Sequence, residues 1–380
     1  DGNLDLIVGN AGEPNRIYRN DGRGRFPITN VITLPNPGQD TRASAVASLD
    51  GDPSLDILAL SSGQPAQLYL NPGQGFVTPT LLLTVTAPLT PVLAIGDLDG
   101  DADFDLVIGG EMSATRVYLN DGHASFRPAD WLTTTASMSA TAIALADVNV
   151  DGRLDLLLGF DGRPVQTFLN EGGAGFAPAG VIGAARARVA ALVAGHLNDD
   201  GRPDVGVAYS NLESKSQALA IYTNYTDTVA SAPIRWDKTS DLSFSDNDTP
   251  LTLALGDLNN DDALDLAVGF GDRSGSAATR NRVLFNDGQA RFSNGDVQFF
   301  GSGADRTYAI ALADLDNDGR LDFIAANHQE RHRIYFTQSS GPQLVFAGNP
   351  GGPRRTYLSL ALGDLDGNGT LDMVAGADAG

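Results

Sequence analysis

Short apolar segments alternate with polar turns along the whole chain, in an order that repeats. Two of them, "ATAIALA" at 140–146 and "LDLLLGF" at 154–160, are bounded by Gly, Asp and Asn. Their length and flanking residues predict buried β-strands rather than helices. A third segment ends in an aromatic residue and Asn, as in "RVYLN" at 116–120, and a Phe six residues after that Asn begins a fourth. Each unit therefore predicts four strands in hairpin order.

The unit recurs with a nearly constant period. An aspartate-rich turn separates its first two strands, and the last Asp of that turn recurs at intervals of 51, 49, 50, 49, 61, 57 and 50 residues, at Asp5, Asp56, Asp105, Asp155, Asp204, Asp265, Asp322 and Asp372. Four-stranded antiparallel units repeated at this period predict an all-β fold, a β-propeller. Small residues in the first strand, such as Ala94 and Ala144, place that strand next to the axis, where there is no room for large side chains.

The repeats predict a single β-propeller domain that spans residues 1–380. The chain supplies three strands of a first unit, six complete units and two strands of an eighth. We expect seven four-stranded antiparallel blades, with eight as the alternative. Because the sequence begins and ends inside a repeat, we also expect it to be an excerpt of a longer chain, whose other domains would be among its partners.

Charge and composition narrow the class of function. The net charge is −22, and the 380 residues include no cysteine. Nucleic-acid binding needs a basic face, and an anionic membrane surface repels such a chain, so neither is an expected partner. No apolar run approaches the roughly 18 to 20 residues of a membrane-spanning helix, so no direct membrane insertion is expected.

The turn between the first two strands has the composition of a cation-binding loop. In "DLDNDGRLD" at 314–322, Asp stands at positions 1, 3, 5 and 9 and Gly at position 6. Oxygen ligands at this spacing can surround a hard cation, and a long ring of protein oxygens favours Ca²⁺ over Mg²⁺. We call this nine-residue segment an aspartate loop and number its positions 1 to 9. A bound cation would turn the repulsion among four carboxylates into attraction.

The predicted ligands of several Ca²⁺ ions, one per intact loop, occupy positions 1, 3, 5 and 9. Two loops carry Asp at all four positions: Asp97, Asp99, Asp101, Asp105 and Asp314, Asp316, Asp318, Asp322. Three loops carry one Asn, which keeps an oxygen but loses a charge: Asp147, Asn149, Asp151, Asp155; Asp257, Asn259, Asp261, Asp265; and Asp364, Asp366, Asn368, Asp372.

Two further loops have an unusual first position. Ser48 precedes Asp50, Asp52 and Asp56, and His196 precedes Asn198, Asp200 and Asp204. Their other oxygen-bearing residues are included among the candidate ligands, and whether these two loops bind metal is left open. At position 6, residues 102 and 262 are Ala and Asp where Gly is expected, which predicts backbone strain.

"GDLDGDADFDLVIGG" at 96–110 and "ADLDNDGRLDFIAAN" at 313–327 resemble the FG-GAP repeats of integrin α-subunit propellers and the related bacterial VCBS-type repeats. The likeness extends over essentially the whole chain. It implies a calcium-stabilised β-propeller, on a cell surface or in secreted material, used for adhesion or ligand binding. In that family the Asp and Asn positions given above are the calcium ligands.

The expected function is that of an exported bacterial module for adhesion, ligand binding or surface assembly, with a protein or glycan ligand on its loop faces. Extracellular calcium modules typically bind at about 10⁻⁴ to 10⁻³ M, which favours an extracellular or cell-surface location. The alternative is a carbohydrate-binding accessory propeller of a secreted polysaccharide-active enzyme. No nucleophile motif or phosphate loop occurs, so the chain itself is not expected to be an enzyme.

The longest intervals between motifs, at 209–250 and 271–281, are the expected places for a ligand. The first of them contains Tyr225 and Trp236, and it also contains "NYT" at 224–226, which matches a glycosylation acceptor.

Overall fold

The fold is that of a computed structural model, which describes residues 6–9, 14–21, 23, 25–27, 29, 31–35, 40–73, 76, 79–132, 138–183, 187–210, 218–226, 234–244, 248–271, 280–301, 306–327, 332–338, 344–348, 356–363 and 372–378. Side chains are described for all of these except 6–9, 81, 83–84, 293–296, 356–363 and 372–378.

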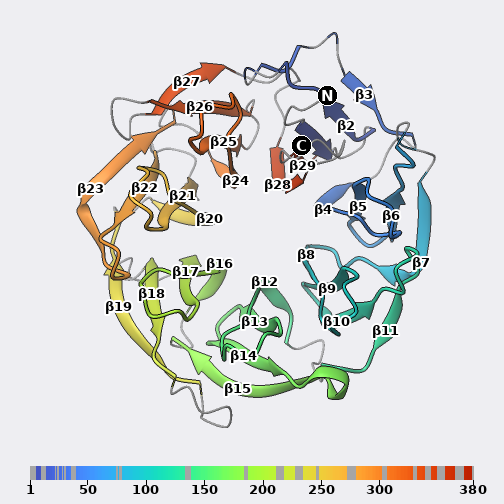
Figure 1. Ribbon diagram of the computed structural model, residues 1–380, viewed down its shortest axis with the longest axis horizontal. Coiled ribbons are helices and arrows are strands. Elements are labelled where there is room, and N and C mark those ends of the chain that lie inside the picture. Colours follow the sequence, from blue (N-terminus) through green and yellow to red (C-terminus); the bar gives the residue numbers. More distant parts are fainter. Residues whose placement is uncertain are drawn as a thin grey trace.

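The described strands form a ring of sheets around a central opening (Figure 1). Six sheets are four-stranded antiparallel blades, whose strands follow one another outward from the axis. Their first strands are β4 Thr41–Ala47, β8 Pro91–Gly96, β12 Ala140–Ala146, β16 Arg188–Gly195, β20 Thr249–Gly256 and β24 Thr307–Ala313. Their second strands are β5 Asp56–Ser61, β9 Asp105–Gly110, β13 Asp155–Phe160, β17 Asp204–Ser210, β21 Asp265–Gly271 and β25 Asp322–Asn327.

The outer half of each blade is built from the remaining two strands of the unit. The third strands are β6 Pro65–Tyr69, β10 Ser113–Leu119, β14 Val165–Asn170, β18 Leu219–Asn224, β22 Asn281–Asn286 and β26 Arg333–Thr337. The fourth strands are β7 Thr80–Thr86, β11 Arg127–Ala129, β15 Phe176–Ile182, β19 Trp236–Leu242, β23 Phe292–Phe300 and β27 Leu344–Gly348. In the described part of the chain, the helical content is the short 3₁₀ turn η1, Gly172–Ala174. The predicted order of strands is therefore confirmed.

Strands from both ends of the chain form the seventh sheet, which has five strands. Its order is β28 (Thr356–Gly363), β29 (Asp372–Asp378), β1 (Leu6–Gly9), β2 (Arg16–Tyr18) and β3 (Val31–Thr33). The strands β1 and β29 pair in parallel, with Leu6 opposite Met373. The predicted count of seven four-stranded blades, and the alternative of eight, is therefore wrong, since six blades have four strands and the closing sheet has five.

The physical reason for the extra strand lies in the repeat. Leu6 and Met373 each follow the last Asp of an aspartate loop, so β1 and β29 are both second strands of their units. Each brings its own hairpin partner, because β1 pairs with β2 and β29 pairs with β28, both antiparallel. Closing the ring therefore places two equivalent strands side by side in one sheet.

The core lies between neighbouring sheets rather than inside any one of them. Every residue of the six second strands in the four-stranded blades is buried. One cluster joins Leu157 of β13 to Val205 and Val207 of β17, in the next blade. The outermost strands are more exposed, as in β27, where only the two end residues are half-buried. A strand covered on both faces reads as a continuous apolar run, which explains the segments seen in the sequence.

Candidate metal centre

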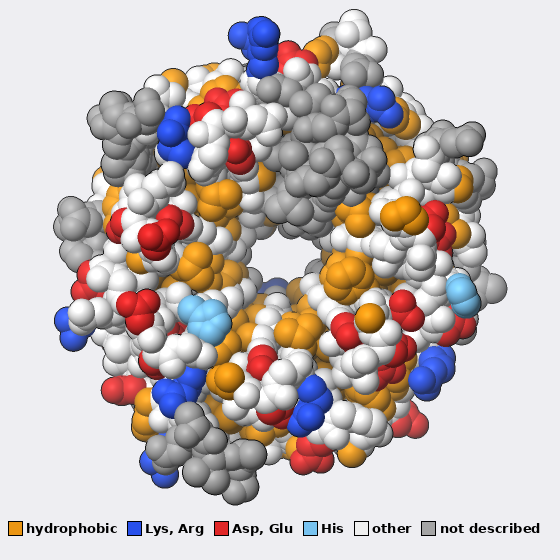
Figure 2. All heavy atoms as spheres, viewed as in Figure 1, with side chains coloured by type: hydrophobic (Ala, Val, Ile, Leu, Met, Phe, Trp, Pro, Cys, Tyr) orange, Lys and Arg blue, Asp and Glu red, His pale blue; other side chains and the backbone are white. Residues whose placement is uncertain are grey.

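Each described aspartate loop connects the first strand of a blade to the second strand of the same blade. Figure 2 shows acidic side chains spread around one face of the ring, between the apolar rim of the central opening and the outer strands. The fold thus repeats one acidic loop from blade to blade.

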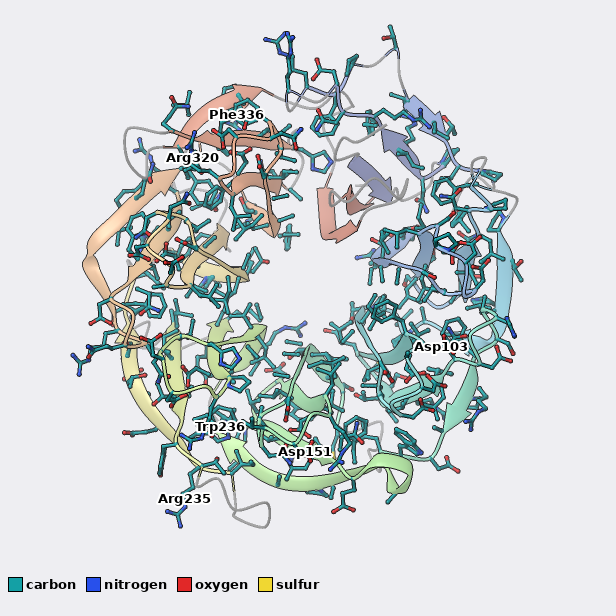
Figure 3. The ribbon with its side chains drawn as sticks, viewed as in Figure 1. Asp103, Asp151, Arg235, Trp236, Arg320 and Phe336 are labelled. Atoms are coloured by element: carbon teal, nitrogen blue, oxygen red, sulfur yellow. The ribbon has the colours of Figure 1, made fainter. Side chains whose placement is uncertain are left out.

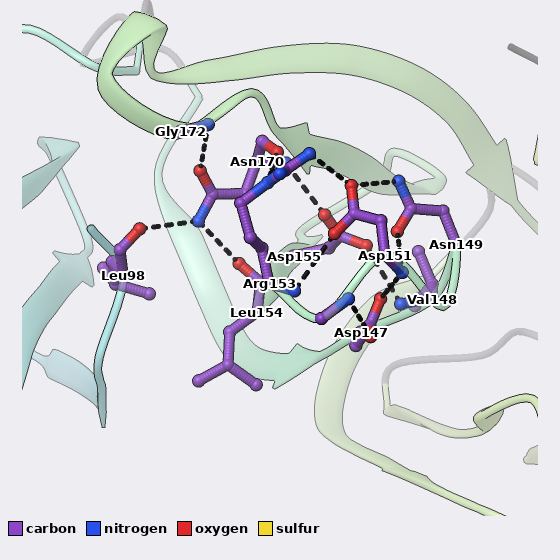
Figure 4. A network of polar contacts seen from close by, with 11 residues as sticks. Leu98, Asp147, Val148, Asn149, Asp151, Arg153, Leu154, Asp155, Asn170 and Gly172 are labelled. Atoms are coloured by element: carbon purple, nitrogen blue, oxygen red, sulfur yellow. Dashed lines mark hydrogen bonds and ion pairs between the residues drawn. The ribbon is translucent and has the colours of Figure 1, made fainter. Parts of the chain in front are cut away.

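The Asp at position 9 is buried and connects its loop to the third strand of the same blade through two hydrogen bonds. In the loop 147–155, Asp155 Oδ2 accepts the backbone N–H of Val148 at 2.9 Å and Oδ1 accepts that of Asn170, at the end of the third strand, at 2.8 Å (Figure 4). The same pair of contacts occurs at Asp56, Asp105, Asp204, Asp265 and Asp322. Each oxygen keeps a second lone pair, so these residues could still be metal ligands.

Burial shifts the pKa of these position 9 carboxyls upward. Desolvation is the main cause, and two backbone hydrogen bonds oppose it. The pKa of Asp155 and of Asp322 is raised to about 7. The pKa is raised to about 6 at Asp56, Asp105, Asp204 and Asp265. Neighbouring carboxylates of the same loop add to the shift, so a cation beside them would favour the ionised form.

The Asp at position 1 organises the turn itself. Asp147 Oδ1 accepts the backbone N–H of Asp151 at 2.9 Å, and Oδ2 accepts that of Gly152 at 2.7 Å. Asp257 and Asp314 hold positions 5 and 6 of their loops in the same way, and Asp97 holds positions 4 and 6. Where Ser48 replaces Asp, its hydroxyl instead donates to the backbone carbonyl of Asp52 at 2.5 Å.

Backbone conformation separates the six described loops into two groups. The four loops that begin with Asp have positive φ at positions 4 and 6, at Gly100 and Ala102, Val150 and Gly152, Asn260 and Asp262, and Asn317 and Gly319. The loops that begin with Ser48 and His196 have one such residue each, Gly51 and Gly201. The predicted backbone strain at Ala102 and Asp262, which both stand at position 6, is confirmed by φ values of 73° and 70°. An Asp at position 1 thus accompanies the tighter turn.

Carboxylates converge in the two loops that have Asp throughout. Carboxylate oxygens of Asp97, Asp99 and Asp101 lie within 4.8 Å of one another, and those of Asp314, Asp316 and Asp318 do the same. At position 3, Oδ1 of Asp99 and Oδ1 of Asp316 are buried and have no hydrogen-bond partner. Buried polar atoms are almost always paired, so this pattern calls for a further partner such as a bound cation.

The pKa of the position 3 carboxyl reflects the same crowding. Burial is the main cause that raises the pKa of Asp99, and the charge of Asp101 is the next. Burial also raises the pKa of Asp316, and Asp318 and Asp314 add to that shift. Oxygen donors of this kind suit a hard cation, so these residues fit the Ca²⁺ that the sequence predicts.

The loops with Asn at position 3 are arranged differently. Asn149 Nδ2 donates to Asp151 Oδ2 at 2.9 Å, and Asn259 Nδ2 donates to Asp261 Oδ2 at 2.9 Å. The Asn amide therefore donates to the position 5 carboxylate oxygen, Oδ2, that a cation would use. In the remaining loops, Asp50 Oδ1 accepts the N–H of Asp52 and Asn198 Oδ1 accepts that of Asp200.

The last aspartate loop falls mostly outside the described residues. Asp364, Asp366 and Asn368 lie outside them, and Asp372 begins β29, for which the backbone alone is described. Most of the interval 271–281 and parts of 209–250 lie outside them as well.

Sequence analysis missed a contact that links neighbouring blades. The Asn at the end of the third strand donates from Nδ2 to the carbonyl of position 2 in the preceding loop, as in Asn170 to Leu98 O at 2.7 Å (Figure 4). The same contact joins Asn120 to Leu49, Asn224 to Val148, Asn286 to Leu197 and Asn20 to Leu315. The recurring Asn was visible in the sequence, but its spacing indicated only a turn.

This contact also determines whether the glycosylation acceptor at 224–226 is accessible. Asn224 is fully buried, its Nδ2 donates to Val148 O, and its Oδ1 accepts the N–H of Thr226. Its amide is therefore inaccessible in the folded protein. Among the aromatic candidates, Tyr225 is half-exposed, while Trp236 packs against an apolar cluster between two blades.

A cleft lies between two neighbouring aspartate loops. It has a volume of about 440 Å³ and is lined by Asp257, Asn260, Asp262, Asp314, Gly319, Arg320 and Leu321. Polar side chains from both loops meet there, and one of them is the cationic Arg320.

The chain belongs to the family of FG-GAP-like repeat proteins. The model of that repeat matches residues 1–59, 49–108, 97–158, 147–207, 271–325 and 314–375, which together cover most of the chain. Each match extends across strands of two neighbouring sheets and includes an aspartate loop. A search of curated proteins finds no match.

Solved structures with a similar fold are distant in sequence. Two are crystal structures of BBS1N in complex with ARL6DN, soaked with lead or with mercury, each 13% identical to this chain. The lead form has a TM-score of 0.53 and covers 87% of both chains, and the mercury form has 0.54 and covers 90% of this chain and 93% of that one. The SapL1 lectin in complex with alpha methyl fucoside, 13% identical, has a TM-score of 0.47 over 82% of this chain and 97% of that one. The two likenesses to BBS1N show a similar fold alone.

Proposed function

We propose that this chain is a calcium-stabilised β-propeller module of an exported bacterial protein, which serves adhesion, ligand binding or surface assembly. The observation that carries the proposal is the pair of buried, unpartnered Oδ1 atoms of Asp99 and Asp316, each beside two further carboxylates. A divalent cation would satisfy those oxygens and offset part of the negative charge of the loop. The ion would then connect the first and second strands of its blade.

The residues rank the loops by their suitability for Ca²⁺. The loops 97–105 and 314–322 offer carboxylates at positions 1, 3 and 5. The loops 147–155 and 257–265 require the Asn149 and Asn259 amides to turn their oxygens toward the ion. The loops that begin with Ser48 and His196 lack the position 1 carboxylate and the tighter turn, so they rank last.

The location proposed for the protein follows from the affinity expected of such loops. Extracellular calcium modules bind at about 10⁻⁴ to 10⁻³ M, so they are filled outside a cell and largely empty inside it. In the part of the chain that the structure describes, no helix is long and apolar enough to cross a membrane.

A protein ligand on the loop face is the favoured partner. The similar propeller of BBS1N is in complex with a protein, ARL6DN, in both of its crystal structures. A rigid ring that holds loops at fixed spacing is suited to binding of this kind. We propose no catalytic step for this chain.

A glycan is the second candidate ligand, and the cleft between the loops 257–265 and 314–322 favours it. The volume of about 440 Å³ lies within the usual range for a small-molecule pocket, and its polar lining would pair with hydroxyl groups. A glycan array and a pull-down, both with calcium-loaded protein, discriminate between the two ligands.

Metal removal should destabilise the protein. We expect Ca²⁺ to raise the melting temperature and exhaustive chelation with EDTA to lower it, because binding to the folded state alone stabilises by about 2 kcal/mol per site when free Ca²⁺ is roughly fifty times Kd. Asp99→Asn should reduce the calcium-dependent increase, measured by differential scanning calorimetry. Asp237→Asn, at an exposed position on β19, is the matched control. A melting temperature that is the same in EDTA and in millimolar Ca²⁺ would refute the proposal.

A further inference from the structure

An arginine stands at position 7 in three of the described loops. It is Arg153, Arg202 or Arg320, and in each case its guanidinium faces the Asp at position 5 of the same loop. Arg153 Nη2 lies 2.5 Å from Asp151 Oδ2, Arg320 Nη2 is paired with Asp318 Oδ2, and Arg202 Nη1 lies 3.8 Å from Asp200 Oδ2. Because the pairing recurs in three loops, the arginine guanidinium is a regular cationic partner of the position 5 carboxylate.

The arginine is anchored at a second point in two of these loops. Arg153 Nε donates to the backbone carbonyl of Asn170 at 2.8 Å, and Arg320 Nε donates to that of Thr337 at 3.4 Å. Both carbonyls belong to the last residue of the third strand in the same blade. The guanidinium is thus held between that strand and the loop (Figure 4), which lowers the entropic cost of the ion pair.

The oxygen that the arginine takes is the one a metal would need. At position 5, Oδ1 accepts the backbone N–H of position 7, as in Asp151 with Arg153 and Asp318 with Arg320, both at 3.0 Å. Asp101 Oδ1 accepts the N–H of Asp103 in the same way, at 3.0 Å. With Oδ1 engaged in these three loops, Oδ2 is the oxygen left for an arginine or an added cation, and in Asp151 it also accepts the Asn149 amide.

Two loops with the same predicted ligands differ at this position. The loop 97–105 has Asp103 at position 7, and the loop 314–322 has Arg320, although both carry Asp at positions 1, 3, 5 and 9. Figure 3 shows Asp103 and Arg320 on separate blades of the ring. The first loop therefore carries five acidic residues, and the second carries four and one arginine.

We infer that the arginine at position 7 competes with Ca²⁺ for the carboxylate at position 5 and so grades calcium affinity around the ring. This inference depends on the proposed calcium binding. Loops with the arginine carry their own counter-charge and hold their shape without metal, but bind Ca²⁺ more weakly. The loop 97–105 has no such counter-charge, so it binds Ca²⁺ most tightly and depends on it most.

The test exchanges the residue at position 7 in the matched loops. Arg320→Gln should tighten calcium binding at the loop 314–322 by about threefold to tenfold, since it removes a competing charge that is three-quarters buried. Asp103→Arg should weaken binding at the loop 97–105 to a similar degree. Isothermal titration with CaCl₂ measures both. Adding Asp314→Asn to Arg320→Gln assigns the change, because the gain in affinity should then disappear.

Melting in EDTA gives a second measurement that does not depend on calcium. Arg320→Gln should lower the metal-free melting temperature by about 1 to 2 °C, because an ion pair is lost. Asp103→Arg should raise that temperature. If the wild-type protein binds calcium but neither substitution changes the affinity, the inference is overturned and the proposed function stands. If the wild-type protein binds no calcium, both are overturned.

Discussion

Within one aspartate loop, chemically identical side chains have different environments that follow from their positions. The carboxylate at position 9 is buried and holds two backbone N–H groups, and the one at position 1 holds the turn. At position 3, Oδ1 of Asp99 and of Asp316 has no hydrogen-bond partner, whereas at position 5 Oδ1 accepts the N–H of position 7. The spacing of the motif predicted all four as ligands, because a sequence shows which oxygens are near but not which are already paired.

A strained residue offers a prediction at the same scale. Val150 is a β-branched residue with φ of 58°, and the residue is 58% exposed. Asn260 and Asn317 occupy the same loop position with φ of 60° and 59°. Because Asn tolerates this conformation and Val does not, we expect Val150→Asn to raise the free energy of unfolding by about 1 kcal/mol, measured by urea denaturation.

The control for this prediction is Val181→Asn. Val181 is similarly exposed but lies in the strand β15, where Val is favoured, so that variant should gain nothing. Equal effects of the two substitutions would mean that exposure, and not backbone strain, decides the result.

At the scale of elements, glycines in the second strands set how closely neighbouring blades pack. A Cβ at Gly159 of β13 would lie 2.5 Å from Cγ1 and 2.8 Å from Cβ of Val189, in the first strand of the next blade. Gly109 and Gly269 occupy the equivalent position and lie against Ala140 and Thr307 of their neighbours. In the other four-stranded blades, the equivalent position is occupied by Leu60, Ala208 or Ala326. The size of side chain that fits there therefore differs from blade to blade.

This contact predicts the effect of adding one methyl group. Gly159→Ala should lower the free energy of unfolding by about 1 to 3 kcal/mol, because Val189 is stiff and its Cβ cannot move away without the backbone. Gly173→Ala is the matched control, since a Cβ there meets nothing within 4 Å. Combining Gly159→Ala with Val189→Ala should recover part of the loss, and a strictly additive loss in thermal denaturation would argue against the contact.

For the whole molecule, ring closure joins the two ends of the chain. The side chain of Asn20 donates to Leu315 O at 3.2 Å, the same contact that joins other neighbouring blades, here across 295 residues of sequence. The closing sheet therefore makes the same Asn-to-carbonyl contact with the blade of β24–β27 that the other neighbouring blades make with each other. On its inner side it contains β28 and β29, which bring a second copy of the second strand.

The raised pKa values predict a pH dependence of the whole metal-free protein. In the six described loops, each position 9 carboxyl has a folded pKa of about 6 or 7, above the value of 3.8 for an unperturbed Asp. The folded state therefore binds more protons than the unfolded state between about pH 4 and pH 7, so stability falls as pH rises through that window. The repulsion within a chain of net charge −22 acts in the same direction.

We therefore expect the EDTA-treated protein to be more stable at pH 5.5 than at pH 7.5, by on the order of 1 kcal/mol per buried carboxyl. Urea denaturation at the two pH values measures the difference. Saturating Ca²⁺ should reduce it, because a cation favours the ionised carboxylates. Higher stability at pH 7.5 in the metal-free protein would contradict the prediction.

The sequence by itself determined the strands, the period and the loops, because these depend on residues close together in the chain. Its apolar runs predicted β12 and β13, and its missing glycines predicted strain at positions 102 and 262. Only the tertiary structure decided which groups meet across blades, such as Asn170 with Leu98 and Gly159 with Val189. It also decided that β1 and β29 share one sheet. A local pattern cannot show how many sheets close a ring, because closure depends on the packing angle between blades.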